Sequence, residues 1–154
     1  MSQKNYLEHN CPIAQAMAVL GGQWTFLIAR DLMNGINKFD NIQKSLKVSR
    51  NLLTLRLQQM ERDGLAQKVV PDGLKRSIYK PTQKCFDLTN TLLALSEWSE
   101  KWIPDPNGPR IKVTSPTTGE SLKLAVLPSK QAEKYSNQIL DITYGSDLKQ
   151  RMSL

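Results

Sequence analysis

The chain has 154 residues, which is enough to bury one good core and a small appendage. No apolar run approaches the ~20 residues of a membrane span and no charged-then-apolar leader opens the sequence, so we expect a cytoplasmic protein with no membrane partner. Two cysteines and one histidine give neither a disulfide framework nor a zinc-binding spacing, which predicts no metal and no cofactor. The sequence also lacks a Gly-rich phosphate loop and a Ser/His/Asp arrangement, and we therefore expect no enzyme.

The formal net charge of +7 is confined to one segment of the chain. Residues 38–84 hold eleven of the 21 Lys and Arg residues but four of the 14 Asp and Glu residues, so the other ten basic and ten acidic residues cancel. A basic balance confined in this way is the electrostatic footprint of a phosphate-binding surface. A basic surface that serves solubility alone is more commonly scattered over the chain.

The first part of the chain predicts helices in close succession. Cys11-Pro12 begins the first helix, because proline is favoured at the first helical position, and Gly21-Gly22 ends it. Trp24–Met33 is apolar on all sides and belongs in the core. Lys38–Leu46 follows as a short amphipathic helix, and a brief turn leads from it into a further helix. Two helices joined this tightly predict a helix-turn-helix.

The helix after this turn has two faces of different chemistry. Ser49 is a good N-cap, and Gly64 suits the left-handed position just past a helix end. At about 100° per residue the apolar side chains share one sector, which holds Leu52, Leu53, Leu57 and Met60. The opposite sector holds Arg50, Asn51, Thr54, Gln58 and Arg62, with Glu61 beside them.

The polar sector carries side chains that hydrogen-bond base edges, because Arg reads guanine, Asn and Gln read adenine, and Thr meets a base edge or a thymine methyl. We expect the DNA contacts of this helix to come from Ser49, Arg50, Asn51, Thr54 and Gln58. An ordinary solvated helix face is the alternative for this stretch taken alone. Arg56 falls inside the apolar sector, which favours an ion pair or a snorkelled stem over a base contact.

A hairpin is predicted directly after the helix-turn-helix. Leu65–Val70 and Ser77–Lys80 read as strands, and Pro71-Asp72-Gly73 between them has turn chemistry. In this position a hairpin forms a wing, whose tip residues Lys75 and Arg76 would contact the DNA backbone or the minor groove. A generic surface hairpin is the alternative.

The rest of the chain predicts a long helix and a tail. The helix runs from Thr82 to about Trp102, and its wide apolar band favours a partner chain over packing on its own core. Residues 104–109 read as a linker between a domain of residues 1–103 and an extension of residues 110–154. In the extension, Ile111–Thr114 and Ser121–Leu127 are predicted to form a β-hairpin, followed by a short helix over Lys130–Leu140. Extra dimer contact and effector cover are both open as roles for this extension.

Residues 11–102 resemble the HxlR family of bacterial winged-helix transcription regulators, which is related to the MarR type. The matching string is Cys11-Pro12, Gly21-Gly22-Gln23-Trp24-Thr25, Gly35, Phe39, Ser49, Leu53-Thr54, Arg56-Leu57, Asp63-Gly64-Leu65, Tyr79 and Thr82. The resemblance implies an α+β, mainly helical winged helix-turn-helix with a long C-terminal dimerisation helix. It also implies a homodimer formed by the first and last helices, with the Ser49 helix in the major groove of an inverted repeat. We assign the dimer interface to Ile13, Met17, Leu92, Leu95, Trp98 and Trp102.

The resemblance also draws attention to the two cysteines. Several members of the family sense oxidants or electrophiles through the cysteine at this Cys-Pro position, and the dipole of a helix N-terminus favours a thiolate there. Cys11 is therefore a candidate redox switch, with a small half-buried interface residue as the alternative. Cys85 replaces a usual Gly of the family and could act as a resolving partner only within ~7 Å between α-carbons. Leu55 stands where relatives often carry a polar residue.

These observations predict a homodimeric, sequence-specific transcription repressor. Its partners would be double-stranded operator DNA and either a small effector or an oxidant acting at Cys11. A winged-helix module that binds a protein instead of an operator is the alternative, since fold does not fix function. The placement of the charge favours nucleic acid.

Overall fold

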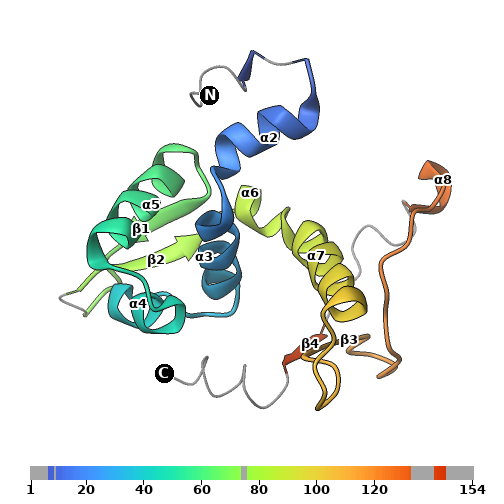
Figure 1. Ribbon diagram of the computed structural model, residues 1–154. Coiled ribbons are helices and arrows are strands. Elements are labelled where there is room, and N and C mark those ends of the chain that lie inside the picture. Colours follow the sequence, from blue (N-terminus) through green and yellow to red (C-terminus); the bar gives the residue numbers. More distant parts are fainter. Residues whose placement is uncertain (1–6, 9, 74–75, 133–140, 145–154) are drawn as a thin grey trace. The chain divides into compact units, whose positions relative to one another are not determined.

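The computed structural model describes residues 7–8, 10–73, 76–132 and 141–144 (Figure 1). Its described residues fall into two compact units, one reaching to Thr89 and the other starting at Asn90. Within this part of the chain no single helix is long and apolar enough to cross a membrane, although the two N-terminal helices pass that test as a pair bent by 71°.

The first unit contains the predicted helix-turn-helix and hairpin in the expected order. Its elements are α2 (Pro12–Leu20), α3 (Gln23–Met33), α4 (Phe39–Leu46), α5 (Arg50–Arg62), β1 (Ala66–Val69), β2 (Ile78–Pro81) and α6 (Gln83–Phe86). Proline stands at the start of α2, and Gly21 ends this helix with a left-handed φ of 62°. The prediction of the four helices α2 to α5 and of the two strands is confirmed.

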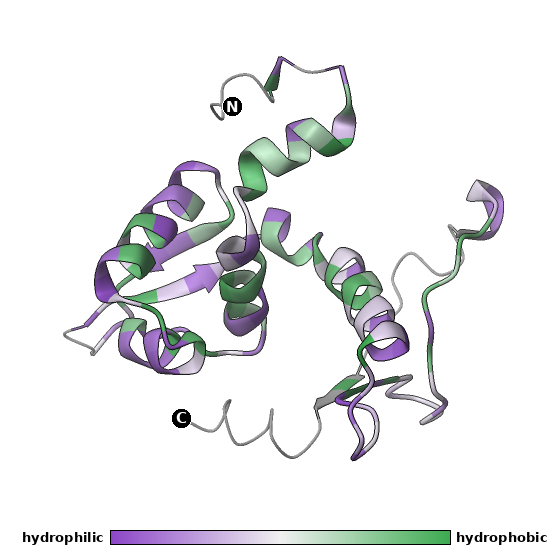
Figure 2. Ribbon diagram, viewed as in Figure 1, coloured by the Kyte–Doolittle hydropathy of each residue, from purple (hydrophilic) through white to green (hydrophobic). Residues whose placement is uncertain are grey.

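Helix α5 is held by the local features that the sequence predicted. The Ser49 hydroxyl accepts a hydrogen bond from the Leu52 amide at 3.3 Å, which satisfies one donor of the first turn. At the other end, Gly64 has a φ of 71°, and the Leu65 amide donates to the Met60 carbonyl at 2.8 Å. Both hydrophilic and hydrophobic residues lie along this helix (Figure 2), and the buried ones recur every three to four residues, as an amphipathic helix requires.

The core of the first unit lies between α3, α4, α5 and the hairpin. Its largest fully buried side chains are Ile28, Ile42, Leu53, Leu57, Met60, Leu65, Asp31 and Cys85. Three of them come from the predicted apolar sector of α5, and the fourth residue of that sector, Leu52, is half-buried. Burial of this sector sets which side of α5 remains exposed.

The hairpin is fixed beside the helix-turn-helix by backbone hydrogen bonds. Strands β1 and β2 pair antiparallel, with Ala66 opposite Pro81 and Val69 opposite Ile78. The Tyr79 amide donates to the Asn37 carbonyl at 2.8 Å, which ties β2 to the loop before α4. The wing therefore has a defined position relative to α4.

The predicted long helix over residues 82–102 is divided into two helices. Helix α6 ends at Phe86, and α7 (Thr89–Trp102) begins after a two-residue turn. The Thr89 hydroxyl donates to the Phe86 carbonyl at 2.6 Å. In a continuous helix this carbonyl would accept from the amide four residues on, so the hydroxyl competes with helix propagation. The prediction of one uninterrupted helix was wrong.

The second unit combines α7 with β3 (Ile111–Thr114), α8 (Ser129–Ala132) and β4 (Asp141–Tyr144). Strand β3 is where the sequence predicted it, but it pairs antiparallel with β4. The predicted partner, Ser121–Leu127, contributes a single bridge between Thr114 and Ser121. Beyond that bridge the Leu124 amide donates to the Glu97 carboxylate of α7 at 3.0 Å, so the chain leaves β3. Residues 133–140 of the predicted C-terminal helix lie outside the described residues.

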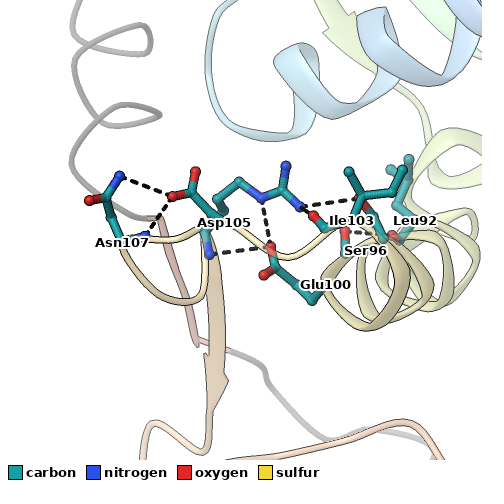
Figure 3. Close-up of polar contacts among 8 residues, drawn as sticks. Leu92, Ser96, Glu100, Ile103, Asp105 and Asn107 are labelled. Atoms are coloured by element: carbon teal, nitrogen blue, oxygen red, sulfur yellow. Dashed lines mark hydrogen bonds and ion pairs between the residues drawn. The ribbon is translucent and has the colours of Figure 1, made fainter.

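The segment predicted as a linker is folded onto α7. The Asn107 amide and side chain donate to the Asp105 carboxylate at 2.9 and 3.1 Å, which closes a turn (Figure 3). Arg110 pairs with Glu100 at 3.0 Å and donates to the Ile103 carbonyl at 2.6 Å. The compact units divide at Asn90, whereas the sequence analysis drew its boundary at residues 104–109.

Candidate nucleic-acid interface

The exposed side of α5 carries the predicted reading residues. Leu53, Leu57 and Met60 are buried. The side chains on the opposite side are exposed to solvent, and they belong to Ser49, Arg50, Asn51, Thr54 and Gln58. Leu55 is exposed as well, with 62% of its surface accessible, so an apolar contact is available next to the polar ones. The helix thus presents hydrogen-bonding groups on one side and is packed into the core on the other.

Arg50 is held in place by residues of α4. Its Nη1 atom donates to the Asp40 carboxylate at 3.1 Å and to the Gln43 amide oxygen at 3.4 Å. Its guanidinium carbon lies 4.9 Å from the centre of the Phe39 ring, which adds a cation–π contact. The first of the predicted reading residues therefore has a defined orientation on the protein.

The wing contributes Arg76 to the same surface. The Arg76 side chain is 92% exposed, and its Nη1 atom lies 3.9 Å from the second carboxylate oxygen of Asp40. Lys75, the other predicted tip residue, lies outside the described residues. Asp40 therefore contacts a cation of α5 and a cation of the wing. The sequence analysis missed this residue; the available signal was that Asp40 is one of the four acids in the basic segment.

Arg56 lies on the protein side of α5. Its Nη1 atom would be 3.2 Å from a β-carbon placed on Gly21, the left-handed residue that ends α2. The side chain is half-buried, and among the residues with described positions it forms no salt bridge. This placement agrees with the expectation of a snorkelled stem and separates Arg56 from the reading residues.

The two cysteines differ in environment. Cys11 is the N-cap residue of α2 and is half-buried. Cys85, in α6, is fully buried, and the loss of solvent around its thiol raises its pKa to about 11. A thiol with this pKa is protonated at neutral pH and reacts slowly. In the described ranges no three His, Cys, Asp or Glu side chains are grouped to hold a metal ion.

Most of the predicted dimer residues are large apolar side chains that are exposed to solvent. In α2, Ile13 is 73% exposed and Met17 is also open to solvent. In α7, Leu95, Trp98 and Trp102 are exposed, and Leu92 is half-buried. Exposed tryptophans of this extent are typical of a surface that contacts another macromolecule.

The second unit also contains an open groove of about 1280 Å³. Residues of α7 and of the extension line it, and the apolar ones include Leu93, Trp98, Ile111, Leu122 and Leu124. The residues of this groove come from both sides of the segment that was predicted as a linker. The groove shows that part of the tail lies against α7 and encloses an apolar surface with it.

The fold agrees with the comparisons to known proteins. The family model of the HxlR-like helix-turn-helix matches residues 19–107. The chain belongs to this family. One relative, the uncharacterised HTH-type transcriptional regulator Rv3095 of Mycobacterium tuberculosis, is 30% identical over 109 residues, covering 70% of this chain and 69% of Rv3095. Members of the family regulate transcription.

Two solved structures extend the comparison. The crystal structure of PA1607, a candidate transcription factor, matches with a TM-score of 0.73 at 27% identity, covering 82% of this chain and 89% of PA1607. The matched share of 82% is larger than residues 1–107, where the family model ends, could provide. The similarity to PA1607 therefore includes part of the extension. The reduced form of the transcriptional regulator YodB from Bacillus subtilis matches with a TM-score of 0.50 at 26% identity, covering 61% of this chain and 95% of YodB.

Proposed function

We propose that this HxlR-family protein is a homodimeric transcription repressor that binds an inverted-repeat operator through α5 and the wing. The observation that carries the proposal is the exposed side of α5, where Arg50, Asn51, Thr54 and Gln58 stand together over a buried apolar side. These groups match the donors and acceptors of base edges in the major groove. The net charge of +7 lies in the same segment, which supports phosphate contacts on either side of the groove.

Dimerisation is supported by the apolar surface of α2 and α7. Trp98 and Trp102 are 58% and 62% exposed in the single chain, and aromatic residues are enriched in buried interface cores. A two-fold dimer presents two α5 helices to two half-sites of an inverted repeat. A dimer seated on such a site excludes other proteins from it, which is the basis for proposing repression.

The proposed switch is oxidation of Cys11. This thiol stands at the N-terminus of α2, a helix that carries two proposed interface residues, so a change in its covalent state would alter the spacing of the two subunits. Cys85 is a poor partner for the chemistry, because burial keeps its thiol protonated. YodB, which has a comparable fold, has been solved in a form named as reduced.

The test is a binding titration with DNA from immediately upstream of the protein's own gene, at two salt concentrations and with and without diamide. We expect a specific complex whose association constant falls steeply with salt, since each phosphate contact releases counterions. The Arg50→Ala/Thr54→Ala variant should lose the preference for this DNA over an unrelated duplex. Arg62→Ala, which removes a charge at the other end of α5, should keep it.

Three outcomes decide between the possibilities. Equal binding by Arg50→Ala/Thr54→Ala and by the wild type would show that the reading surface lies elsewhere. A diamide response that persists in Cys11→Ser would place the switch at another residue. Absence of a specific complex from a confirmed dimer would favour a protein-binding role for the winged helix.

A further inference from the structure

One carboxylate, that of Asp40, contacts both cations that flank the proposed reading surface. Its Oδ1 atom accepts from Arg50 at the start of α5, at 3.1 Å, and its Oδ2 atom lies 3.9 Å from Arg76 of the wing. Asp40 itself belongs to the first turn of α4, where a negative charge is favoured by the helix dipole. Three elements of the winged helix therefore meet at this side chain.

These ion pairs contribute little to the stability of the fold. The side chain of Asp40 is 54% exposed and that of Arg50 is 65% exposed, and pairs with this exposure are largely screened by water and salt. The main physical effect of Asp40 is thus on the two arginines. It restricts where Arg50 points, and it offsets part of the positive charge that would otherwise meet a phosphate.

The hydrogen bonds of Arg50 define which edge of its guanidinium is occupied. Both acceptors from α4, Asp40 and Gln43, use the Nη1 atom, which has two hydrogens to donate. The guanidinium carbon lies 4.9 Å from the centre of the Phe39 ring, and this cation–π contact further restricts the group. Among the described residues no protein acceptor is bonded to the Nε and Nη2 atoms. That edge has the fork of donors that pairs with O6 and N7 of guanine.

We infer that Arg50 reads a guanine in each half-site and that Asp40 is the residue that positions it for this contact. The inference rests on the proposed function and makes it specific, since it names the base, the edge and the supporting residue. A guanidinium that is already oriented loses less side-chain freedom when it binds. The same carboxylate weakens contacts of Arg50 and Arg76 with phosphates, which lowers binding to unrelated DNA. Both effects raise the ratio of specific to non-specific affinity.

The experiment begins with selection of preferred duplexes from a random pool by the full-length wild type. Each guanine of the selected half-site is then replaced by 7-deazaguanine, which lacks the N7 acceptor, and dissociation constants are measured by fluorescence anisotropy. At one guanine we expect the wild type to lose affinity by roughly ten- to a hundredfold, because one charge-assisted hydrogen bond of the bidentate pair is removed. Arg50→Ala should show almost no loss at that guanine.

Asp40→Asn is the decisive variant, and Asp72→Asn is its matched control. Both remove one negative charge from the basic segment, but Asp72 lies in the wing turn and forms no salt bridge with any residue whose position is described. Asp40→Asn should reduce the 7-deazaguanine effect at the Arg50 guanine alone and should bind an unrelated duplex more tightly. Asp72→Asn should keep the wild-type effect at that guanine. Both variants should melt within a few degrees of the wild type.

The outcomes separate this inference from the function on which it rests. A wild type that selects no motif would refute the proposed function itself. A selected motif with no guanine that depends on Arg50 would refute the reading role and leave the function standing. A wild-type 7-deazaguanine effect in Asp40→Asn would refute the positioning role.

Discussion

Helices α5 and α7 are similar in length, but their exposed sides have opposite chemistry. α5 has 13 residues, buries Leu53, Leu57 and Met60, and exposes polar and charged side chains. α7 has 14 residues, buries Leu93 alone among its residues, and exposes Leu95, Trp98 and Trp102. Amphipathicity holds the first helix on its own core, whereas the second keeps large apolar surfaces in water.

This difference indicates two kinds of partner. A polar surface with fixed arginine geometry is suited to the base edges and phosphates of DNA, because its hydrogen-bonding groups lose little on leaving water for equivalent partners. An apolar surface with tryptophans gains by burial against another apolar surface. The predictions that follow test both sides of α5, the exposed side of α7 and the buried thiol of α6, from the largest expected effect to the smallest.

The buried side of α5 should carry the largest share of stability. Leu57→Ala removes a fully buried side chain and leaves a cavity, so we expect the free energy of unfolding to fall by about 2–5 kcal/mol. Leu55→Ala, at an exposed position of the same helix, should change it by less than about 0.5 kcal/mol. Urea titrations followed by circular dichroism measure both. Similar losses for the two variants would contradict the assignment of the two sides of α5.

The exposed side of α7 should matter for association rather than for folding. If it forms the proposed dimer interface, Trp98→Ala should weaken the dimer by about 2 kcal/mol or more, or roughly thirtyfold in the dissociation constant, as aromatic hot spots do. Lys101→Ala on the same helix should have a much smaller effect. Sedimentation equilibrium measures the change in mass with concentration. A dimer unaffected by Trp98→Ala would move the interface away from this side of α7.

The features of the first unit that the sequence predicted are those with local causes. Proline at the start of α2, Ser49 before α5 and glycines at helix ends specify boundaries through their own backbone preferences. The spacing of apolar residues then sets which side of α5 is buried, and so the candidate reading residues follow from the pattern. The helix-turn-helix and wing could be predicted because each step depends on near neighbours.

The features that the sequence did not predict depend on particular contacts. The break before α7 is accompanied by one hydrogen bond, from the Thr89 hydroxyl to the Phe86 carbonyl. The partner of β3 is β4, about 30 residues away, and composition does not reveal such a long-range pairing. The position of Asp40 between Arg50 and Arg76 requires three elements to be packed before the ion pairs exist. Residue types suggested a basic surface, but only the packed structure shows that the Asp40 carboxylate lies between two of its arginines.

Helix α6, which lies between α5 and α7 in the sequence, should make the stability of the fold depend on pH through the buried thiol of Cys85. Its folded pKa of about 11 exceeds the ordinary value of 9.0, so the folded state holds the thiol proton more tightly than the unfolded state does. This contribution, about 2–3 kcal/mol, is present below pH 9 and is lost as the pH rises to 11. Tyr79, whose pKa burial also raises, adds a loss in the same direction. Chemical denaturation between pH 8 and 10.5 should show less pH dependence in Cys85→Ala than in the wild type.

Ser49 should have the smallest effect on folding and a separable effect on binding. Ser49→Ala removes the acceptor of the Leu52 amide and should cost about 1 kcal/mol of stability. Ser49→Asp keeps a capping acceptor and should retain nearly all of the stability, but it adds a negative charge at the end of α5 that is proposed to enter the groove. We therefore expect Ser49→Asp to melt like the wild type and to bind DNA many-fold more weakly. Unchanged DNA binding by Ser49→Asp would mean that the N-terminus of α5 does not face the phosphates of the DNA.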